Sequence, residues 1–466
     1  MLRAAAINII GRNCENMRVL FINASKRWEG RVYREYPYGI GILATLANQA
    51  GYNIRILDMA VDDRDYRAFI REFQPDVVAV SFFSPSVQIA SEVISVIADE
   101  FDVYILTGGI HSTLYPYTVL EYGADVVLKG EGEINFIPVL NCIRDEEECL
   151  DDKLADIPNL VFRNRLGKVI TTGTSERCVD LDTLPVMNRN LFDLSFYDHH
   201  TILTSRCCPF KCHFCCSWAP GGKAGRIMSS ERIIHELEWL VEQYGALTLY
   251  WGDEIFFWNR EERLNFCDML KARNLPIKFI VQLRADLVEE VLVEKLISVG
   301  CVKLCIGAES GSDKILREIN KKITADVIEK AILTSVKMGL PCKTWWMVGL
   351  PGGDKGEQLK ALDVIERARP NEVAVHQFVP LPGSYFWEHA KQYGIHLPEE
   401  ALFESLNYYS DPSKLKYDYI SGEELYDILK TYEKKLLQWG YVSTDLADSN
   451  SKYVFTTPFQ KTTFEI

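Results

Sequence analysis

Five cysteines fall within the ten residues from Cys207 to Cys216, in the segment SRCCPFKCHFCCSW. Three of them, Cys208, Cys212 and Cys215, have the spacing C-x3-C-x2-C. Three thiolates at such short spacing can bind three irons of a 4Fe–4S cube and leave the fourth iron open to a small molecule, to which the cluster can pass an electron. The spacing therefore predicts an iron–sulfur cluster that does its chemistry at an open iron.

Zinc binding and simple packing are less favoured roles for these cysteines. A zinc site needs two CxxC pairs or added histidines at set distances, and only His213 is nearby. Free cysteines that are buried for packing alone fit poorly with the flanking proline and with a loop position after a predicted strand. Because adjacent thiolates are not expected to bind one cube together, Cys207 and Cys216 are predicted to be bystanders.

The bulk composition indicates an acidic protein with more than one domain. The chain has 466 residues, of which 47% are hydrophobic, and its net charge is −14. Such a charge does not favour nucleic acid as a partner, because phosphates require a basic face. No apolar run is long enough to predict a transmembrane segment, and no secretory signal is recognisable. Clustered cysteines without such a signal predict a cytoplasmic enzyme with metal or redox chemistry.

Buried strands alternate with helices from residue 17 to residue 145, after an N-terminal extension of residues 1–16. The predicted strands are RVLFIN, NIRILDM, DVVAVSFF, DVYILTGG and ADVVLKGEGE. Near-continuous Val, Ile and Leu strands that are separated by helices predict an α/β domain with a parallel, doubly wound, Rossmann-like sheet. Ligands of such sheets bind at the carboxyl ends of the strands, which here are rich in glycine and serine.

Three further regions follow in the chain. Residues 146–200 are predicted to be a connector with a small hairpin around LVFRNRLGKVITTG. Residues 201–392 contain about six strand–helix units, which are too few for an eight-fold barrel and predict a partial (β/α)6 barrel. Residues 393–466 are predicted to form a small, mostly helical C-terminal domain.

The cysteine motif and the number of strand–helix units together resemble those of the radical S-adenosylmethionine (SAM) enzymes. In that family the open iron binds the amino and carboxylate groups of SAM. Reductive cleavage of SAM then gives methionine and a 5′-deoxyadenosyl radical, which abstracts hydrogen from the substrate. Many relatives have RGCP where this chain has RCCP, so Cys207 stands in the place of a glycine.

The resemblance extends to four other segments in chain order around the predicted barrel. YWGDEIF resembles the methionine-binding strand end, GAESGS the ribose-contacting motif and WWMVGLPGG the adenine-facing strand, and VQLRAD holds an arginine for the SAM carboxylate. A carboxylate next to the SAM ammonium would make a charge-assisted hydrogen bond. The residues implied to contact SAM are Phe214, Gly252, Asp253, Glu254, Arg284, Glu309, Ser310, Met347 and Gly349.

The N-terminal sheet resembles the cobalamin-binding domain at the front of one large radical SAM subfamily. The matching segments include YPYGIGILATLANQAG and LTGGIHSTLYPYTVLEYGADVVLKGEGE. No D-x-H-x-x-G motif is present in this region, so a histidine ligand to cobalt of that type is not expected. Glycine pairs let a bulky ligand approach the backbone. The residues implied to contact the nucleotide tail of cobalamin are Ser81, Ser84, Gly108, Gly109 and Gly130.

The alternative is a domain that keeps this fold without using cobalamin and only packs against the barrel. Phe82 and Phe83 lie where the cofactor would pass. Aromatic side chains after the first strand either line a cobalamin face or fill that space, namely Trp28, Tyr33, Tyr36 and Tyr38.

The resemblance implies radical chemistry on a small biosynthetic molecule, with cobalamin-dependent C-methylation as the first hypothesis. The alternative is a radical dehydration, rearrangement, cyclisation or epimerisation without transfer of a methyl group from cobalamin. Methylthiolation of tRNA is disfavoured because Cys142, Cys149 and Cys178 do not form a second ligand set. A flavodoxin or ferredoxin-type protein is the expected electron donor. The candidate acid–base residues inside the barrel are Tyr250, Lys343 and His376.

Overall fold

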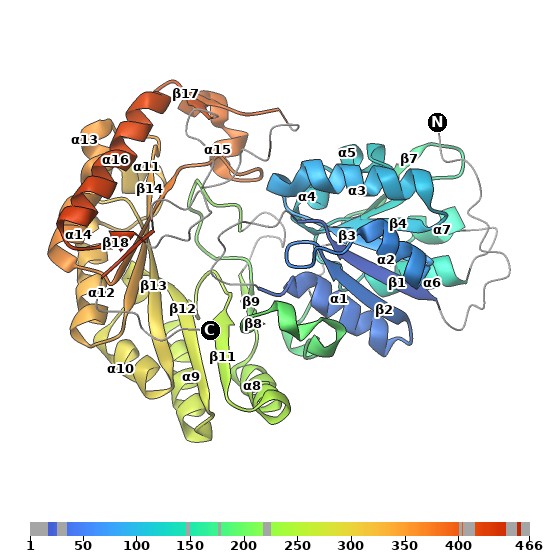
Figure 1. Cartoon of the computed structure of the whole chain (residues 1–466), viewed down its shortest axis with the longest axis horizontal. Coiled ribbons are helices and arrows are strands. Elements are labelled where there is room, and N and C mark those ends of the chain that lie inside the picture. The colour runs from blue at the N-terminus through green and yellow to red at the C-terminus, as the bar shows by residue number, and fades with distance from the viewer. Residues whose placement is uncertain are drawn as a thin grey trace.

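The computed structural model describes residues 17–25, 35–145, 150–175, 179–217, 225–399, 403, 415–443 and 454–457. Each of its two lobes is built on one large sheet with helices around it (Figure 1). The N-terminal extension, Trp28, Tyr33, Cys149 and Cys178 lie outside the described residues.

The first sheet has the strand order β2-β1-β3-β4-β5-β6-β7. Its parallel strands are β1 (Arg18–Asn23), β2 (Asn53–Asp58), β3 (Val77–Ser81), β4 (Tyr104–Gly108) and β5 (Val126–Leu128). The hairpin expected in the connector is present as β6 (Leu160–Arg163) and β7 (Val169–Thr171), and it extends this sheet antiparallel to β5. The chain reverses its direction of winding between β1 and β3, where sheets of this type bind ligands at the carboxyl ends of the strands.

Helices cover both faces of the first sheet. They are α1 (Tyr38–Gln49), α2 (Tyr66–Phe73), α3 (Val87–Glu100), α4 (Gly109–Leu114), α5 (Pro116–Glu121), α6 (Phe136–Arg144) and α7 (Leu150–Ala155), with the 3-10 turn η2 (Ser84–Ser86). Along β3, Val78 and Val80 pack with apolar residues of α2, α3 and α5, whereas Val77 and Ala79 pack with those of α1, α6 and α7. The strands are continuously apolar because both of their faces are buried.

Three 3-10 turns carry the chain from the first lobe to the second, namely η3 (Leu181–Thr183), η4 (Arg189–Leu191) and η5 (Leu194–Phe196). The chain between η3 and η4 packs closely on α1, since a Cβ atom on Gly41 would lie 2.2 Å from Met187 Sδ. The fully buried Arg189 donates a hydrogen bond to the backbone oxygen of Thr201 in the second sheet at 2.8 Å. This segment is therefore packed against both lobes.

In the part of the chain that the structure describes, the second sheet has six parallel strands in chain order. They are β8 (His200–Ile202), β11 (Leu247–Trp251), β12 (Ile277–Arg284), β13 (Cys301–Glu309), β14 (Cys342–Val348) and β15 (Glu372–Gln377). β19 (Val454–Thr456) pairs antiparallel with β15, and β18 (Val442–Ser443) pairs with β19. The predicted α/β fold class, with a Rossmann-like sheet followed by a mostly parallel sheet, is confirmed.

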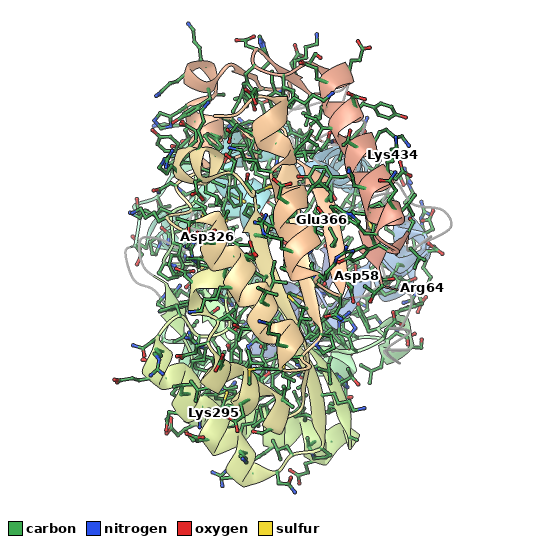
Figure 2. All side chains as sticks on the ribbon, turned by 90° about the vertical axis from the view of Figure 1, so that its left-hand side faces the viewer. Asp58, Arg64, Lys295, Asp326, Glu366 and Lys434 are labelled. Carbon is green, nitrogen blue, oxygen red and sulfur yellow. The ribbon has the colours of Figure 1, made fainter. Side chains whose placement is uncertain are left out.

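Helices cover the outer face of the second sheet, where the exposed Asp326, Glu366 and Lys434 lie (Figure 2). The larger helices are α8 (Ser230–Tyr244), α9 (Arg260–Arg273), α10 (Glu290–Ser298), α12 (Ala325–Lys337), α14 (Ala361–Ala368) and α16 (Gly422–Gln438). The shorter elements are β9 (Ser205–Arg206), β10 (Arg226–Ile227), η6 (Ala285–Leu287), α11 (Asp313–Glu318), α13 (Lys355–Leu359), α15 (Tyr385–Glu388), η7 (Ala390–Tyr393), β16 (Ile395–His396) and β17 (Lys416–Tyr417).

Candidate active site

The five cysteines lie in one loop, and the short antiparallel pair β9–β10 forms its neck. The loop begins directly after Arg206, at the carboxyl end of the second sheet. Cys207 has the left-handed φ of 60°, a conformation that is costly for residues with a side chain and free for glycine. This geometry explains why a glycine suits the position in many related motifs.

The segment after β13 and the start of α15 hold the cysteine loop in place. His213 donates from its backbone nitrogen to Ile319 O at 2.9 Å, and its Nδ1 lies 2.9 Å from Glu318 O. The His213 ring also stacks on Tyr385 with a centroid distance of 4.1 Å. Asn320 adds a hydrogen bond from its side-chain nitrogen to the loop backbone at 2.6 Å. His213 therefore supports the loop through its backbone and ring contacts.

Arg284, at the end of β12, lies directly against one of the predicted iron ligands. Its Nη1 is 3.7 Å from Cys212 Sγ, and its guanidinium lies 3.9 Å from the centre of the Phe210 ring. Its Nη2 donates to Lys321 O at 2.6 Å, and its Nε donates to Asp286 at 3.0 Å. In this structure Arg284 supports the loop, while its predicted contact with the SAM carboxylate stays a prediction.

The predicted iron ligands are thiols in a poorly hydrated environment. Burial raises the pKa of Cys208 to about 11, and burial also raises the pKa values of Cys212 and Cys215. The positive charges of Lys321 and Arg284 act against the rise at Cys212. Metal binding releases such protons, because the thiolate is the ligand. Three thiols with two buried cations beside one of them are a donor set that fits an anionic iron–sulfur cluster.

No three His, Cys, Asp or Glu side chains among the described residues converge closely enough to hold a single metal ion. Three thiolates that each bind a different iron of a cube do not need to meet at one point. Ser217 contacts the third predicted ligand, since Cys215 Sγ lies 3.1 Å from Ser217 Oγ. The assignment of Cys208, Cys212 and Cys215 as ligands, with Cys207 and Cys216 as bystanders, stays a prediction.

Asp253, which follows β11, clamps the chain directly ahead of the cysteines. Its Oδ1 accepts hydrogen bonds from the backbone nitrogens of Thr204 and Ser205, both at 2.8 Å. Its Oδ2 accepts from Trp251 Nε1 at 2.8 Å and from the Thr204 hydroxyl. Because both oxygens are bound within the chain, Asp253 has a supporting role in this structure, and its contact with the SAM ammonium is not tested.

The neighbouring Glu254 is the carboxylate that remains accessible to solvent. Desolvation by the surrounding protein raises the pKa of its carboxyl, a side-chain hydrogen bond with Ser217 acts against this rise, and the charge of Asp253 adds to it. Its own charge raises the pKa values of Cys208, Cys215 and Cys216, so it faces the cysteine loop. Of the two adjacent acids, Glu254 is the one that faces the cysteine loop, and its contact with the SAM ammonium stays a prediction.

The predicted ribose motif ends β13 in a strained conformation. Glu309 has a φ of 66° and pairs with Lys321, whose Nζ lies 2.9 Å from Glu309 Oε1. Lys321 Nζ is also 6.0 Å from the centre of the Phe214 ring, so the motif reaches the cysteine loop. Ser310 is buried and accepts from the backbone nitrogen of Ser312 at 3.1 Å. Sequence reasoning missed Lys321, which no spacing rule connects with Glu309.

The predicted adenine strand end is fixed by neighbouring elements. Gly349 has a φ of 82°, and its backbone nitrogen donates to Gln358 Oε1 at 3.1 Å. Its backbone oxygen accepts from the Tyr419 hydroxyl at 2.9 Å. Both backbone groups of Gly349 are therefore used inside the protein, and Met347 beside it is nearly buried.

The candidate acid–base residues come from three strands of the barrel. Tyr250 accepts a hydrogen bond from Gln282 Nε2 at 2.8 Å. Lys343, near the start of β14, lies 3.7 Å from Glu372. Burial, aided by the positive charge of Lys343, lowers the pKa of His376 to about 4, so its imidazole is neutral at physiological pH. An imidazole with so low a pKa is a weak base, so the expected proton transfer by His376 is disfavoured and a hydrogen-bonding role fits better.

The predicted cobalamin residues meet at one edge of the first sheet. Ser81 and Gly108 are register partners at the ends of β3 and β4. Gly109 has a φ of 89°, and a Cβ atom there would lie 2.7 Å from Ser81 Oγ, so only glycine fits. Gly130 donates from its backbone nitrogen to Thr113 Oγ1 at 2.9 Å. The structure brings these residues together as predicted from the glycine and serine pattern.

The same edge contains buried polar groups that sequence reasoning missed. His111 is fully buried, and its Nδ1 lies 3.0 Å from Ser84 Oγ. Within the described residues the buried hydroxyls of Thr107 and Ser112, which flank the glycine pair, have no hydrogen-bond partner. Polar atoms of this kind beside a glycine pair fit the polar nucleotide tail of cobalamin.

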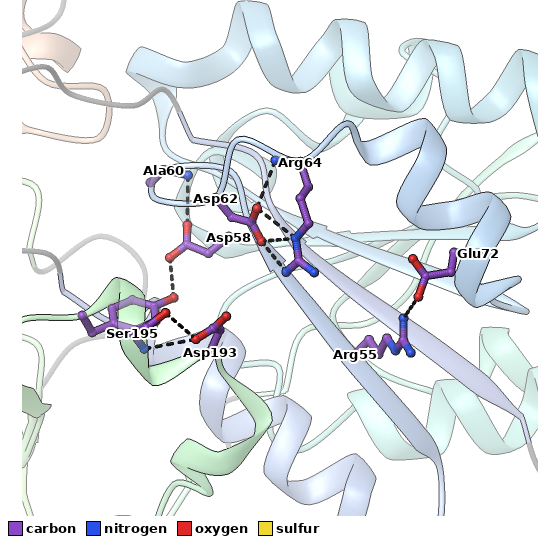
Figure 3. A network of polar contacts seen from close by, with 9 residues as sticks. Arg55, Asp58, Ala60, Asp62, Arg64, Glu72, Asp193 and Ser195 are labelled. Atoms are coloured by element: carbon purple, nitrogen blue, oxygen red, sulfur yellow. Dashed lines mark hydrogen bonds and ion pairs between the residues drawn. The ribbon is translucent and has the colours of Figure 1, made fainter.

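The carboxyl end of the first sheet lies against the chain on both sides of β8, ahead of that strand at Tyr197 and after it at Arg206. Asp58, which ends β2, accepts a hydrogen bond from the Tyr197 hydroxyl at 2.9 Å, and Figure 3 shows Asp58 beside the turn that contains Ser195. Tyr36 is buried and stacks on Tyr197 at 4.1 Å, so it fills the space between the lobes. On the other side, the Phe403 ring lies 6.3 Å from the His111 ring.

Comparison with known proteins identifies both lobes. Residues 31–139 match the B12 binding domain, and residues 202–365 match the Radical SAM superfamily. The chain therefore belongs to the radical SAM superfamily and carries a B12-binding domain in front of the radical SAM domain. It is a cobalamin-dependent radical SAM enzyme, and the predicted cofactors, a 4Fe–4S cluster, SAM and cobalamin, are confirmed.

Individual relatives are distant. An uncharacterized methyltransferase of Pyrococcus horikoshii is 28% identical over 76% of this chain and 78% of its own length. The anaerobic magnesium-protoporphyrin IX monomethyl ester cyclase of Cereibacter sphaeroides is 24% identical over 73% of this chain, which spans 58% of the cyclase. The structure of the radical SAM methyltransferase TsrM from Kitasatospora setae, with cobalamin and a 4Fe–4S cluster bound, aligns with a TM-score of 0.69. That alignment covers 89% of this chain and 91% of TsrM at 17% identity.

Among the described residues, no helix combines the length and apolar character that crossing a membrane requires.

Proposed function

We propose that this protein transfers a methyl group to a carbon atom of a small molecule in a cobalamin-dependent radical SAM reaction. The observation that carries the proposal is the placement of the two cofactor edges. The carboxyl end of the first sheet, with Ser81 and the glycine pair, lies beside the neck of the cysteine loop, because Glu133 after β5 accepts a hydrogen bond from Arg206 at 2.6 Å. A substrate radical formed at the second edge would then be close to a methyl donor at the first.

When they are bound, the cluster and SAM supply the 5′-deoxyadenosyl radical, and cobalamin carries the methyl group. The thiolates of Cys208, Cys212 and Cys215 would hold the cluster, and Arg284 would keep the second of them in place. Glu254, which is accessible and faces the loop, would bind the SAM ammonium. Asp253 would keep the strand end rigid through its four hydrogen bonds.

Inside the barrel, polar groups would orient the substrate below SAM. The hydrogen bond from Gln282 fixes the Tyr250 hydroxyl. His376, which is neutral because burial lowers its pKa, would hydrogen-bond the substrate, and Lys343 would bind an electron-rich group of the substrate. These polar groups support a polar small molecule as the substrate, and a flavodoxin or ferredoxin-type protein as the electron donor completes the proposal.

The relatives support methylation over the alternative. The Pyrococcus horikoshii methyltransferase and TsrM are covered over most of their lengths, whereas the chain spans 58% of the cyclase. A radical rearrangement, dehydration, cyclisation or epimerisation that does not use the methyl group of cobalamin is the competing reaction.

The experiment is to purify the protein without oxygen, reconstitute its cluster and measure bound cobalamin by its visible absorbance. SAM with a deuterated methyl group is then incubated with metabolite fractions and a reductant. Methylation predicts equal formation of S-adenosylhomocysteine and 5′-deoxyadenosine, together with a product that carries the deuterated methyl group. If a fraction supports 5′-deoxyadenosine formation without S-adenosylhomocysteine or a labelled product, methylation is wrong.

A further inference from the structure

The sequence GEGE at residues 130–133 follows β5, and only its first glycine is among the predicted cobalamin contacts. We call residues 130–133 the GEGE turn. Its two carboxylates contact the other lobe. Glu133 Oε1 accepts from Arg206 Nη2 at 2.6 Å, and Glu131 Oε1 accepts from Arg226 Nη2. The cobalamin-binding lobe therefore contacts Arg206, after which the cysteine loop begins, and Arg226, at which the loop ends.

Arg206 and Arg226 are register partners in the β9–β10 pair, which is the neck of the cysteine loop. Like charges directly opposite each other in an antiparallel pair are destabilising. Here each arginine has its own carboxylate. The Glu133 and Glu131 side chains are only 6% and 12% exposed, so solvent screens these ion pairs weakly. The GEGE turn thus supplies one carboxylate to each of the two facing arginines of the neck.

A second set of contacts fixes the turn itself. Arg226 Nη1 donates to Val179 O at 2.7 Å, and the backbone nitrogen of Val179 donates to Glu131 Oε2 at 3.3 Å. On the other side, Gly130 donates from its backbone nitrogen to Thr113 Oγ1, and that hydroxyl donates to Gly109 O at 2.8 Å. A continuous series of hydrogen bonds thus connects the glycine pair of the cobalamin edge with the neck of the cysteine loop.

We propose that the GEGE turn is a positioning element for the iron–sulfur cluster: Glu131 and Glu133 keep the neck of the cysteine loop closed from the other domain. Cobalamin bound at the glycine pair, which rests on the proposed function, orders the same turn and slows the loss of the cluster. By linkage, the factor by which cobalamin raises the equilibrium affinity for the cluster is also the factor by which the cluster raises the affinity for cobalamin.

The first test uses protein without cobalamin. We compare the rate at which an iron chelator removes the cluster from the wild type and from the double variant Glu131→Gln/Glu133→Gln. We expect at least a tenfold faster loss in the variant. Glu72→Gln is the matched control, because it removes an exposed ion pair with Arg55 in the same domain. Equal rates of iron loss in the wild type and the double variant would overturn the proposal.

A second test separates charge compensation from general damage. Adding Arg206→Gln and Arg226→Gln to the double variant removes the repulsion, so iron retention should return toward that of the wild type. In Glu133→Gln alone, a negative charge near the cluster is lost, and the midpoint potential measured by electron paramagnetic resonance should become more positive. A fourfold variant that loses iron as fast as the double variant would contradict the role of these charges.

The third test adds cobalamin. We expect it to slow iron loss several-fold in the wild type and to have no such effect in the double variant, although that variant still binds cobalamin. If the wild type binds no cobalamin, the proposed function is wrong. The effect of Glu131 and Glu133 on iron loss, measured in the first test, would still hold. If cobalamin binds but leaves iron loss unchanged, the coupling proposed here is wrong.

Discussion

Lys321 and Glu309 form an ion pair between the end of β13 and the loop after α11, with Nζ and Oε1 2.9 Å apart. Their side chains are only 5% and 11% exposed. The backbone oxygen of Lys321 also accepts a hydrogen bond from Arg284, which contacts the predicted iron ligand Cys212. The predicted ribose motif and the cysteine loop therefore depend on the same lysine.

Lys321→Met is expected to leave the Glu309 carboxylate buried without its partner. Breaking a buried pair from one side costs about 3–5 kcal/mol, so the unfolding free energy of the apoprotein should fall by about that amount. Chemical denaturation followed by circular dichroism measures it. Lys322→Met, at the exposed neighbouring position, is the control. The double variant Lys321→Met/Glu309→Gln should recover part of the lost stability. If Lys321→Met were as stable as the control Lys322→Met, the role of the pair would be contradicted.

Cys207→Gly is expected to keep the cluster. Its left-handed φ of 60° favours glycine, and relief of that strain should stabilise the loop by about 1 kcal/mol. Cys212→Ala should abolish both the visible absorbance of the cluster and the cleavage of SAM. The iron content per chain is measured in both variants after anaerobic reconstitution. A Cys207→Gly protein without iron would show that the assignment of ligands is wrong.

Asp253→Asn is expected to damage the fold of the strand end. The asparagine nitrogen is a donor, and it would face the Trp251 nitrogen and the Thr204 hydroxyl, which donate to the present carboxylate. An unmatched buried polar group costs about 1–3 kcal/mol. The thermal midpoint of the apoprotein is measured, and it should be lower than that of the wild type. If Asp253→Asn melts like the wild type and only SAM affinity falls, Asp253 binds SAM directly.

Glu254→Gln is expected to leave the fold intact and to weaken SAM binding. Because a hydrogen bond to a charged group contributes about 1.5–3 kcal/mol, the Kd for SAM should rise by about tenfold or more. Calorimetry with the reconstituted protein measures it, and Glu261→Gln on the exposed start of α9 is the control. An unchanged Kd would remove Glu254 from the SAM site.

His111 is expected to make the first lobe sensitive to acid. Burial lowers its pKa from 6.5 to about 4. The unfolded chain therefore binds a proton that the folded chain does not bind between these two values, so stability is complete above pH about 6.5 and falls as the pH decreases toward 4. The thermal midpoint of the cobalamin-free protein, followed across this range, should fall less steeply in His111→Asn. If the thermal midpoint falls equally steeply with decreasing pH in the wild type and in His111→Asn, the prediction is contradicted.

Much of the fold was predictable because local patterns determine it. The continuous apolar strands gave the parallel sheets, and the cysteine spacing located the loop. The glycine and serine residues at the strand ends predicted which side chains lie together at one edge of the first sheet, where Ser81 and Gly108 are neighbours. Each of these features lies within a short stretch of sequence.

The site details that sequence reasoning missed depend on long-range contacts. Asp253 and Glu254 are adjacent acids of similar chemistry, and only the positions of Thr204 and Trp251 distinguish their roles. The pairing of Arg206 with Glu133 joins residues that are 73 positions apart in the sequence. A lone histidine such as His111 has no spacing signal, since its burial depends on the helices around it.

The GEGE turn also has a consequence for the order in which the protein matures. A ribosome completes residues 130–133 before it makes either arginine of the neck, and N-terminal domains generally fold first during synthesis. The carboxylates are therefore already in place when the cysteine loop emerges. If Glu131 and Glu133 hold the neck as proposed, the domain that is made first would serve as a folding template for the cluster site that is made second.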